Sequence, residues 1–202
     1  IKKKYFVINI DSVTYSSNAV VDGTVLQASD GLKINSVLIE KLESQTSSNV
    51  SAADKANAIN AKTALTGVTA RGFNSVDITV DLDTATMTNH DNATIQGVTI
   101  DFSGDNTLAE MISAINAGLA GTSDVIATAS DTGDLRLSSA SGVTIAFDDT
   151  ATTTGQGALF TGATYTSDGT TITATNGIGS ARGYLELTSF NGNAIKVEDG
   201  PQ

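Results

Sequence analysis

The sequence predicts an α+β chain that is mostly β, with two domains of which the second is inserted into a loop of the first. One ordered pattern of segments occurs twice along the 202 residues, and internal repeats of this kind define an architecture. Gly, Ser, Thr and Asn are abundant, which is typical of short strands joined by turns. Several segments also alternate apolar and polar residues, which predicts half-buried strands.

Each copy of the pattern has an opening strand, a capped helix, a second strand and a closing hairpin. The first copy comprises residues 31–39, 51–61, 67–70, 183–189 and 192–199. The second comprises residues 94–100, 107–117, 125–127, 133–139 and 142–149. Because the second copy interrupts the first, we predict a parent domain of residues 1–71 and 181–202 and an inserted domain of residues 72–180.

Three strands are expected before the first helix. Residues 5–10 are rich in β-forming side chains. Residues 20–27 form a second such run, which is turned or bounded by Asp22 and Gly23. Residues 32–39 alternate loosely and are predicted to be the strand that opens the first copy.

Both predicted helices carry the same start signal. Ser51 and Thr107 are favourable N-cap residues, and each is followed three positions later by an acidic residue, Asp54 or Glu110. Apolar or small residues then recur at helical spacing, at Ala52, Ala56, Ile59 and Thr63 and at Leu108, Met111, Ile112 and Ile115. Gly67 and Gly118 are expected near the two helix ends.

A short strand is predicted after each helix, at residues 68–70 and 125–127, and each copy then closes with a hairpin. In the second copy, Leu135 and Leu137 are expected to pair with a returning strand that contains Val143, Ile145 and Phe147. In the first copy, the corresponding residues are Leu185, Leu187, Ile195 and Val197, around an Asn191–Gly192 turn.

Two further features lie between the halves of the first copy. Residues 76–82 alternate strictly between apolar and polar side chains, which predicts a half-buried strand. Residues 164–166 and 171–173 flank the turn-forming residues 167–170, which predicts another hairpin.

Composition excludes several classes of protein. The net charge of −11 argues against nucleic-acid binding, which needs clustered Lys and Arg, and the basic run at residues 2–4 is expected to be solvated. The absence of cysteine excludes disulfides and cysteine-bound metals. No apolar run approaches the roughly 20 residues of a membrane helix. The chain begins at Ile1 without an initiator Met, and we interpret it as a fragment of a longer protein.

The ordered segments resemble the repeat in the outer, variable domains of bacterial flagellins and of the flagellar filament cap protein. The match is carried by Ala-Ile-Asn-Ala at residues 58–61 and 114–117, Gly-Val-Thr-Ala at residues 67–70, and the two closing segments. It covers a little over half of the chain. The long amphipathic helices that flank the variable region of a whole flagellin are absent, so assembly is inferred from the resemblance alone.

The resemblance implies a structural subunit of the extracellular flagellar filament that supports motility, is not an enzyme and needs no cofactor. It implies self-assembly through terminal helices missing here, without nucleic-acid or membrane partners. Exposed hydroxyls such as those of residues 152–154 are candidate acceptors for O-linked sugars. The filament cap protein and a surface adhesin are the alternatives, because strand-rich outer domains with loops also serve recognition.

No catalytic, cofactor-binding or metal-binding residue is predicted. The only histidine, His90, is expected in a polar loop, and no Gly-x-Ser-x-Gly elbow accompanies it. A single histidine also excludes the two-histidine zinc protease motif. Asp101, Ser103 and Asp105 are spaced like the start of a calcium loop, but the sixth and twelfth positions carry Asn106 and Ile112 instead of Gly and an acidic ligand.

The remaining candidates are expected to be structural. The acidic pairs at residues 148–149 and 198–199 are interpreted as hydrated carboxylates at strand ends. The glycine-rich residues 155–157 and 177–179 lack the context of a phosphate-binding loop and are predicted to be loops. Asn60 and Asn116 are expected to form hydrogen bonds with the backbone at the helix ends.

Overall fold

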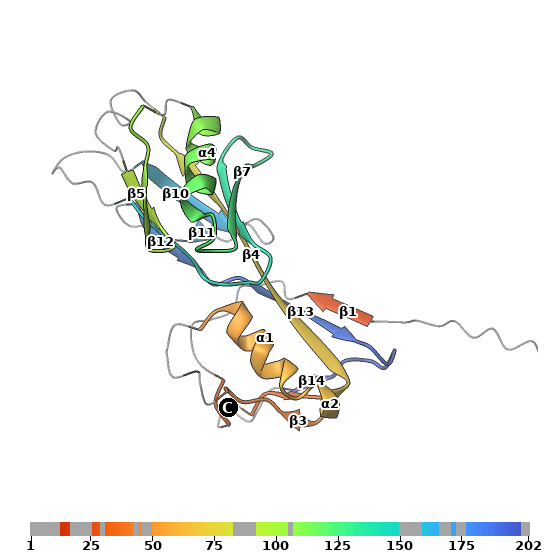
Figure 1. Cartoon of the computed structure of the whole chain (residues 1–202). Helices are drawn as coiled ribbons and strands as arrows, with labels where there is room; N and C mark the ends of the chain where they lie inside the picture. The colour runs from red at the N-terminus through yellow and green to blue at the C-terminus, as the bar shows by residue number, and fades with distance from the viewer. Residues whose placement is uncertain are drawn as a thin grey trace, which may run out of the picture.

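The computed structural model describes residues 13–16, 26–28, 31–42, 45, 50–82, 92–104, 107–149, 159–165, 171–172 and 177–198. These residues form three β-sheets and three helices, and strands predominate, which confirms the mostly β class. Figure 1 shows an elongated molecule with α1 near one end, α4 near the other and β4 running between them. The strand predicted at residues 5–10, and all but the last two residues of the one at 20–27, lie outside the described residues.

We group the elements into two units that share the long strand β4 (Val68–Val80). The first unit contains residues 68–73 of β4 together with β1 (Val13–Ser16), β2 (Lys33–Ile34), β3 (Val37–Leu38), α1 (Ala52–Asn60), α2 (Thr63–Thr66), β13 (Tyr184–Ser189) and β14 (Val197–Glu198). The second unit contains residues 74–80 of β4 together with β5 (Asn92–Ile95), β6 (Val98–Asp101), α4 (Leu108–Leu119), β7 (Val125–Ala129), β8 (Leu135–Ser139), β9 (Ile145–Asp148), β10 (Phe160–Tyr165), β11 (Thr171–Ile172) and β12 (Ile178–Ala181).

The strands form one seven-stranded, one four-stranded and one three-stranded sheet. The largest has the order β1-β13-β4-β10-β11, with β8 also paired to β4 and β7 paired to β8. The second sheet has the order β12-β9-β5-β6 and belongs to the second unit, whereas the third has the order β14-β2-β3 and belongs to the first unit. The predicted hairpin near residue 168 is confirmed, because β10 and β11 pair antiparallel.

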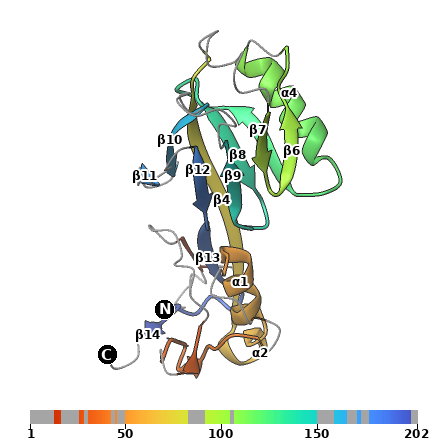
Figure 2. The ribbon, with the colours of Figure 1, turned by 90° about the vertical axis from the view of Figure 1, so that its left-hand side faces the viewer.

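The strand β4 replaces two strands that the sequence predicted separately, at residues 68–70 and 76–82. Its residues alternate between buried and more exposed positions from Val68 to Ile78 without a break, so nothing in the pattern ends the strand at Gly72. Residues 68–73 pair with β13, and residues 74–80 pair with β8 and β10. Figure 2 shows β4 as one strand along most of the molecule, so the predicted domain boundary at Gly72 lies inside a strand.

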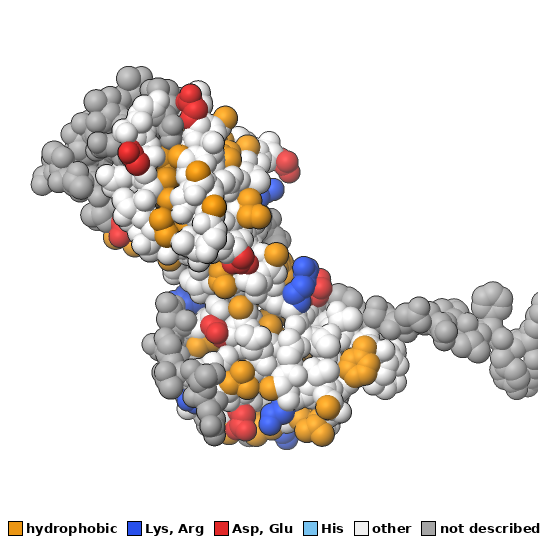
Figure 3. Space-filling view, in the orientation of Figure 1, with side chains coloured by type: hydrophobic (Ala, Val, Ile, Leu, Met, Phe, Trp, Pro, Cys, Tyr) orange, Lys and Arg blue, Asp and Glu red, His pale blue; other side chains and the backbone are white. Residues whose placement is uncertain are grey.

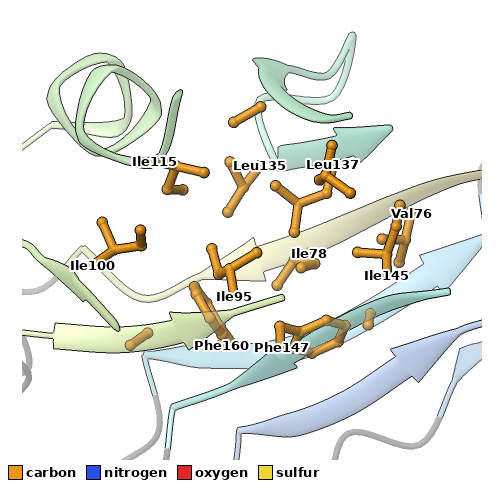
Figure 4. Close-up of a cluster of buried hydrophobic side chains, with 14 of the residues drawn as sticks. Val76, Ile78, Ile95, Ile100, Ile115, Leu135, Leu137, Ile145, Phe147 and Phe160 are labelled. Carbon is orange, nitrogen blue, oxygen red and sulfur yellow. The ribbon is translucent and has the colours of Figure 1, made fainter. Parts of the chain in front are cut away.

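The buried apolar side chains form two separate clusters. The cluster of the first unit consists of residues from β2, α1 and β4 together with Ile39, which follows β3. Its buried members are Ile34, Ile39, Ala56, Ile59, Val68 and Ala70. The other cluster is larger and contains residues of the second unit together with Tyr184 of β13. It lies between the seven-stranded and four-stranded sheets, with α4 closing one side (Figure 4). It includes an edge-to-face pair of Phe147 and Phe160, whose ring centroids are 5.8 Å apart.

The opening segment of each copy is a tight hairpin, so the single strand predicted at residues 32–39 is wrong. Asn35 and Ser36 have φ angles of 50° and 67° and form a two-residue turn between β2 and β3. Gln96 and Gly97, with φ angles of 55° and 77°, form the same turn between β5 and β6. Positive φ at both central residues is the geometry that such hairpins require, but Asn-Ser and Gln-Gly are weak signals for it.

The prediction of two closing hairpins is also wrong, because the two strands of each predicted hairpin belong to different sheets. β8 pairs with β4 and β7, whereas β9 pairs with β5 and β12. Similarly, β13 pairs with β1 and β4, whereas β14 pairs with β2. The turns at Gly142 and Gly192 therefore carry the chain from one sheet to another within each unit.

The predicted helix starts are confirmed in both copies. Ser51 caps α1 by accepting from the Asp54 amide, and the Asp54 carboxylate accepts in turn from the Ser51 amide. Thr107 caps α4 in the same way by accepting from the Glu110 amide. The first helical segment is interrupted after Asn60, and Gly67, with a φ of 70°, ends the short α2 rather than α1.

The two units share strand order and register. Val197 lies opposite Ile34 as Phe147 lies opposite Ile95, and each closing strand therefore returns to the opening hairpin of its own unit. The correspondence includes one strand that the sequence pattern did not reveal. β1 corresponds to residues 74–78 of β4, as β13 corresponds to β8. Both pairs have the same register, because Val13 lies opposite Ser189 and Asn74 lies opposite Ser139.

Candidate functional site

The asparagine of the repeated Ile-Asn pair forms two hydrogen bonds with a strand in the first unit. Asn60, the last residue of α1, donates from Nδ2 to the carbonyl oxygen of Ala70 at 2.8 Å. Its Oδ1 accepts from the amide of the same residue at 2.7 Å. The side-chain amide thus satisfies both backbone groups of Ala70, as a neighbouring strand would.

The same contact recurs in the second unit. Asn116 of α4 donates to the Ala127 carbonyl oxygen at 2.9 Å and accepts from the Ala127 amide at 2.8 Å. The prediction that Asn60 and Asn116 bind backbone is therefore confirmed, but the partner is the following strand and not the helix end. Among the described residues, β7 pairs only with β8, so Asn116 lies on its free edge and blocks the addition of another strand there.

A second repeated contact joins each opening turn to its closing strand. The backbone N–H of Asn35 donates to the Lys196 carbonyl oxygen, and the side-chain Oδ1 of Asn35 accepts from the backbone N–H of Lys196 at 2.9 Å. Gln96 makes the same two bonds with Ala146, at 2.9 Å from its amide and 2.7 Å to its Oε1. These bonds hold both turns in the left-handed region, which is unfavourable for residues with a side chain.

A third repeated contact lies just before the strand that follows each helix. The Thr66 hydroxyl accepts from the Val68 amide at 3.1 Å, and the Ser123 hydroxyl accepts from the Val125 amide at the same distance. Sequence inspection missed this pair, although a hydroxyl residue two positions before each Val is a visible signal for such a turn.

The acidic pair at residues 148–149 is not the hydrated pair that we predicted. Asp149 is only 1% exposed, and its Oδ2 accepts from the amides of Leu159 and Phe160. The buried carboxylate therefore joins the ends of the segment between residues 149 and 159. In the other pair, Asp199 lies outside the described residues, and an ion pair with Lys196 lowers the pKa of Glu198.

Asp124 and Ser139 organise the turn between β8 and β9. The Asp124 carboxylate accepts from the hydroxyls of Ser139 and Ser141 at 2.8 and 2.7 Å, and from the Ser141 amide at 3.1 Å. Partial burial of the carboxyl raises its pKa, but the hydrogen bonds from Ser141 and Ser139 outweigh burial, and the pKa of Asp124 is lowered. The arrangement stabilises the turn.

Asp77 and Arg136 form a two-point ion pair across β4 and β8. The guanidinium nitrogens donate to both carboxylate oxygens at 2.8 and 3.0 Å, and these hydrogen bonds raise the pKa of Arg136 further. The ion pair is partly exposed and connects two paired strands of the largest sheet.

The remaining predicted candidates are placed as follows. Asp101 accepts from the Ser103 amide at 2.8 Å, and hydrogen bonds from Ser103 lower its pKa; Asp105 lies outside the described residues, as do His90 and residues 152–157. Of the predicted loop at residues 177–179, only Gly177 lies in a turn, since Ile178 and Gly179 belong to β12. Within the described segments, no group of three metal-ligating acidic, His or Cys side chains occurs.

One open groove lies over the outer face of the four-stranded sheet. It has a volume of about 470 Å³ and is lined by Thr94, Gly97, Ala146, Phe147, Asp148, Ile178, Gly179 and Ser180. These side chains include one carboxylate and two hydroxyls, but they do not converge with a general base or a second charged group. On the face shown in Figure 3, the acidic and basic side chains are scattered rather than gathered around a hollow.

No protein-family model matches the chain, and a search of curated proteins finds no significant match. No helix in the described part of the chain is long and apolar enough to cross a bilayer.

Proposed function

We propose that this chain is a structural part of the bacterial flagellar filament, made of the surface-exposed outer domains of a flagellin that supports motility. The observation that carries the proposal is the ordered segment pattern, including residues 58–61, 67–70 and 114–117, that resembles flagellin outer domains. The equivalent contacts of Asn60 and Asn116 support it, because they give the repeated Ile-Asn pair a structural role in both units.

The proposal includes a nested pair of domains, with residues 72–180 inserted into a parent formed by residues 1–71 and 181–202. Two observations support the nesting. The strand that leaves the first unit and the strand that returns to it are antiparallel neighbours, with Arg71 opposite Glu186. The smaller apolar cluster also consists of parent residues alone, whereas the larger one adds Ala181 and Tyr184 of the parent to residues of the insertion.

In this proposal the chain projects from the filament surface outside the cell, and terminal helices of the full-length flagellin make the filament contacts. The role is mechanical, without catalysis or a cofactor. The net charge of −11 suits this position, because like charge keeps closely packed copies of a domain soluble. Exposed hydroxyls, such as those of residues 152–154, are proposed acceptors for O-linked sugars.

Quantitative mass spectrometry of sheared, purified flagella tests the proposal. Peptides of this chain should account for most of the filament mass and should be absent from the same preparation of a non-flagellated mutant. A few copies per filament would instead favour the cap protein, which carries the same repeat. Absence from flagella would overturn the proposal and favour an adhesin.

A further inference from the structure

Four chain segments meet where the first unit joins the second, and we call this place the joint. They are the start of α1 (residues 51–53), the middle of β4 (72–74), the turn after β8 (141–143) and the connection from β12 to β13 (181–183). Residues 51–53 belong to the first unit and residues 141–143 to the second, whereas residues 72–74 and 181–183 pass from one unit to the other.

Backbone hydrogen bonds cross the joint from α1. The first amides of a helix have no partner within the helix and need acceptors elsewhere. Here the Ala52 amide donates to the Arg182 carbonyl oxygen at 2.9 Å, and the Ala53 amide donates to the Gly142 carbonyl oxygen at 3.0 Å. The turn after β8, in the second unit, thus supplies an acceptor for the helix of the first unit.

Asn74 binds the other side of the joint. Its side chain is 2% exposed, and Nδ2 donates to the carbonyl oxygens of Val143 and Ala181, each at 2.8 Å. One amide group therefore fixes the first residues after the turn and the last residue of β12 to β4. Leaving buried carbonyl groups unpaired is costly, so separating these segments is disfavoured.

Three glycines allow the segments to approach so closely. A Cβ atom at Gly72 would lie 2.8 Å from the Ala52 carbonyl carbon, and one at Gly142 would lie 2.5 Å from the Gly72 carbonyl carbon. A Cβ atom at Gly183 would lie 2.6 Å from the Phe73 carbonyl oxygen. The atoms in the way belong to the backbone, which cannot move aside as a flexible side chain can.

We propose that the joint locks the two units at one fixed angle, so that the chain behaves as a single stiff body rather than as two domains on a hinge. Relative motion is the ordinary expectation for two domains that share a small interface. In this molecule, a hinge would break the hydrogen bond from Ala53 to Gly142, separate the closely packed backbones at Gly72 and Gly142, and bend a continuous β4. The inference concerns the mechanics of the chain and is independent of the proposed function.

Distance measurements between two spin labels can test the lock in the whole chain. The sequence has no cysteine, so Asn57→Cys in α1 and Ser113→Cys in α4 place one label on an exposed position of each unit. Pulsed electron resonance should give one narrow distance distribution for this doubly labelled protein. A broad or multi-peaked distribution would overturn the proposal.

Gly142→Ala should then loosen the joint, and Gly97→Ala is the matched control. Gly142 and Gly97 have φ angles of 78° and 77°, so the backbone strain of an added Cβ is alike, but nothing lies within 4 Å of the Cβ position at Gly97. We expect the distribution to broaden about twofold or more in Gly142→Ala and to stay narrow in Gly97→Ala. Equal widths in the two folded variants would overturn the proposal.

Asn74→Ala provides a second variant in case Gly142→Ala does not fold. It removes the hydrogen bonds that hold Val143, next to the Gly142 acceptor of α1, and Ala181 on β4, and it adds no atoms. A broadened distance distribution supports the lock, and a distribution as narrow as that of the parent protein contradicts it.

Discussion

Asn60 and Asn116 occupy the same place in the first and second units, but the apolar clusters beneath them differ in size. The described residues of the first cluster include 6 buried apolar side chains, without an aromatic ring, and those of the second include 20. The hydrogen bonds that connect helix to strand and turn to strand are nonetheless the same in both units.

The difference separates two contributions to the fold. Repeated polar contacts, which satisfy backbone groups at fixed positions, define how the helix, hairpin and strands of each unit connect. The number of buried apolar side chains varies, because the second unit contains further strands, including β10 and β12, in addition to the elements that both units share. We therefore expect the second unit to be the more stable of the two, since it buries more apolar side chains.

The largest effects should come from the buried isoleucine that precedes each Asn. Ile115 is 0% exposed and Ile59 is 2% exposed. Replacing either by Ala should lower the free energy of unfolding by about 2–5 kcal/mol, with Ile115→Ala nearer the upper end because Ile115 lies in the larger apolar cluster. Chemical denaturation measures both, and a larger loss for Ile59→Ala would contradict the ranking of the two units.

A smaller effect is expected for the two asparagines themselves. Asn60→Ala and Asn116→Ala should each cost about 1–2 kcal/mol, because each leaves the amide and carbonyl of one strand residue without a protein partner. Asn116 is the less exposed of the two, so its substitution should cost more. Asn57→Ala, at an exposed position of α1, is the control, and an equal loss in the control would remove the special role of Asn60.

The smallest predicted difference is a pH dependence that arises from Asp124 of the second unit. The lowered pKa of Asp124 means that its carboxylate stabilises the fold above the unfolded pKa of about 3.9 and that this contribution is lost as the pH falls through the lowered value. The first unit has Gly67 at the corresponding position before its strand. Asp124→Asn should therefore flatten the acid side of the stability profile, and an unchanged profile would exclude this role.

Local features of the fold could be predicted from sequence, whereas strand partners could not. Ser51, Thr107 and Gly67 act within a few residues of their own positions, and their capping roles follow from residue type and spacing. Alternation shows that Ile145 and Phe147 face the same side, but it does not reveal that their neighbours are β5 and β12 rather than β8. That choice depends on contacts far apart in sequence.

Two structural residues of the second unit were missed for different reasons. Asn74 lies two positions before Val76 on the inward face of a strand, so its buried position could have been read from the alternation. Asp149 follows a strand directly and has no local signal, because the amides that it binds lie at Leu159 and Phe160.

The central claim is that the second unit interrupts a complete copy of the first, and deletion of residues 72–180 tests it most directly. The deletion joins Arg71 to Ala181 and leaves residues 181–185 as the connection between Arg71 and its partner Glu186, much as residues 130–134 connect the paired Ala129 and Leu135 of β7 and β8. We predict that the shortened chain keeps its secondary structure and melts in one sharp, reversible transition. A broad, non-cooperative loss of structure would show that the first unit is not a complete fold and would contradict the nesting.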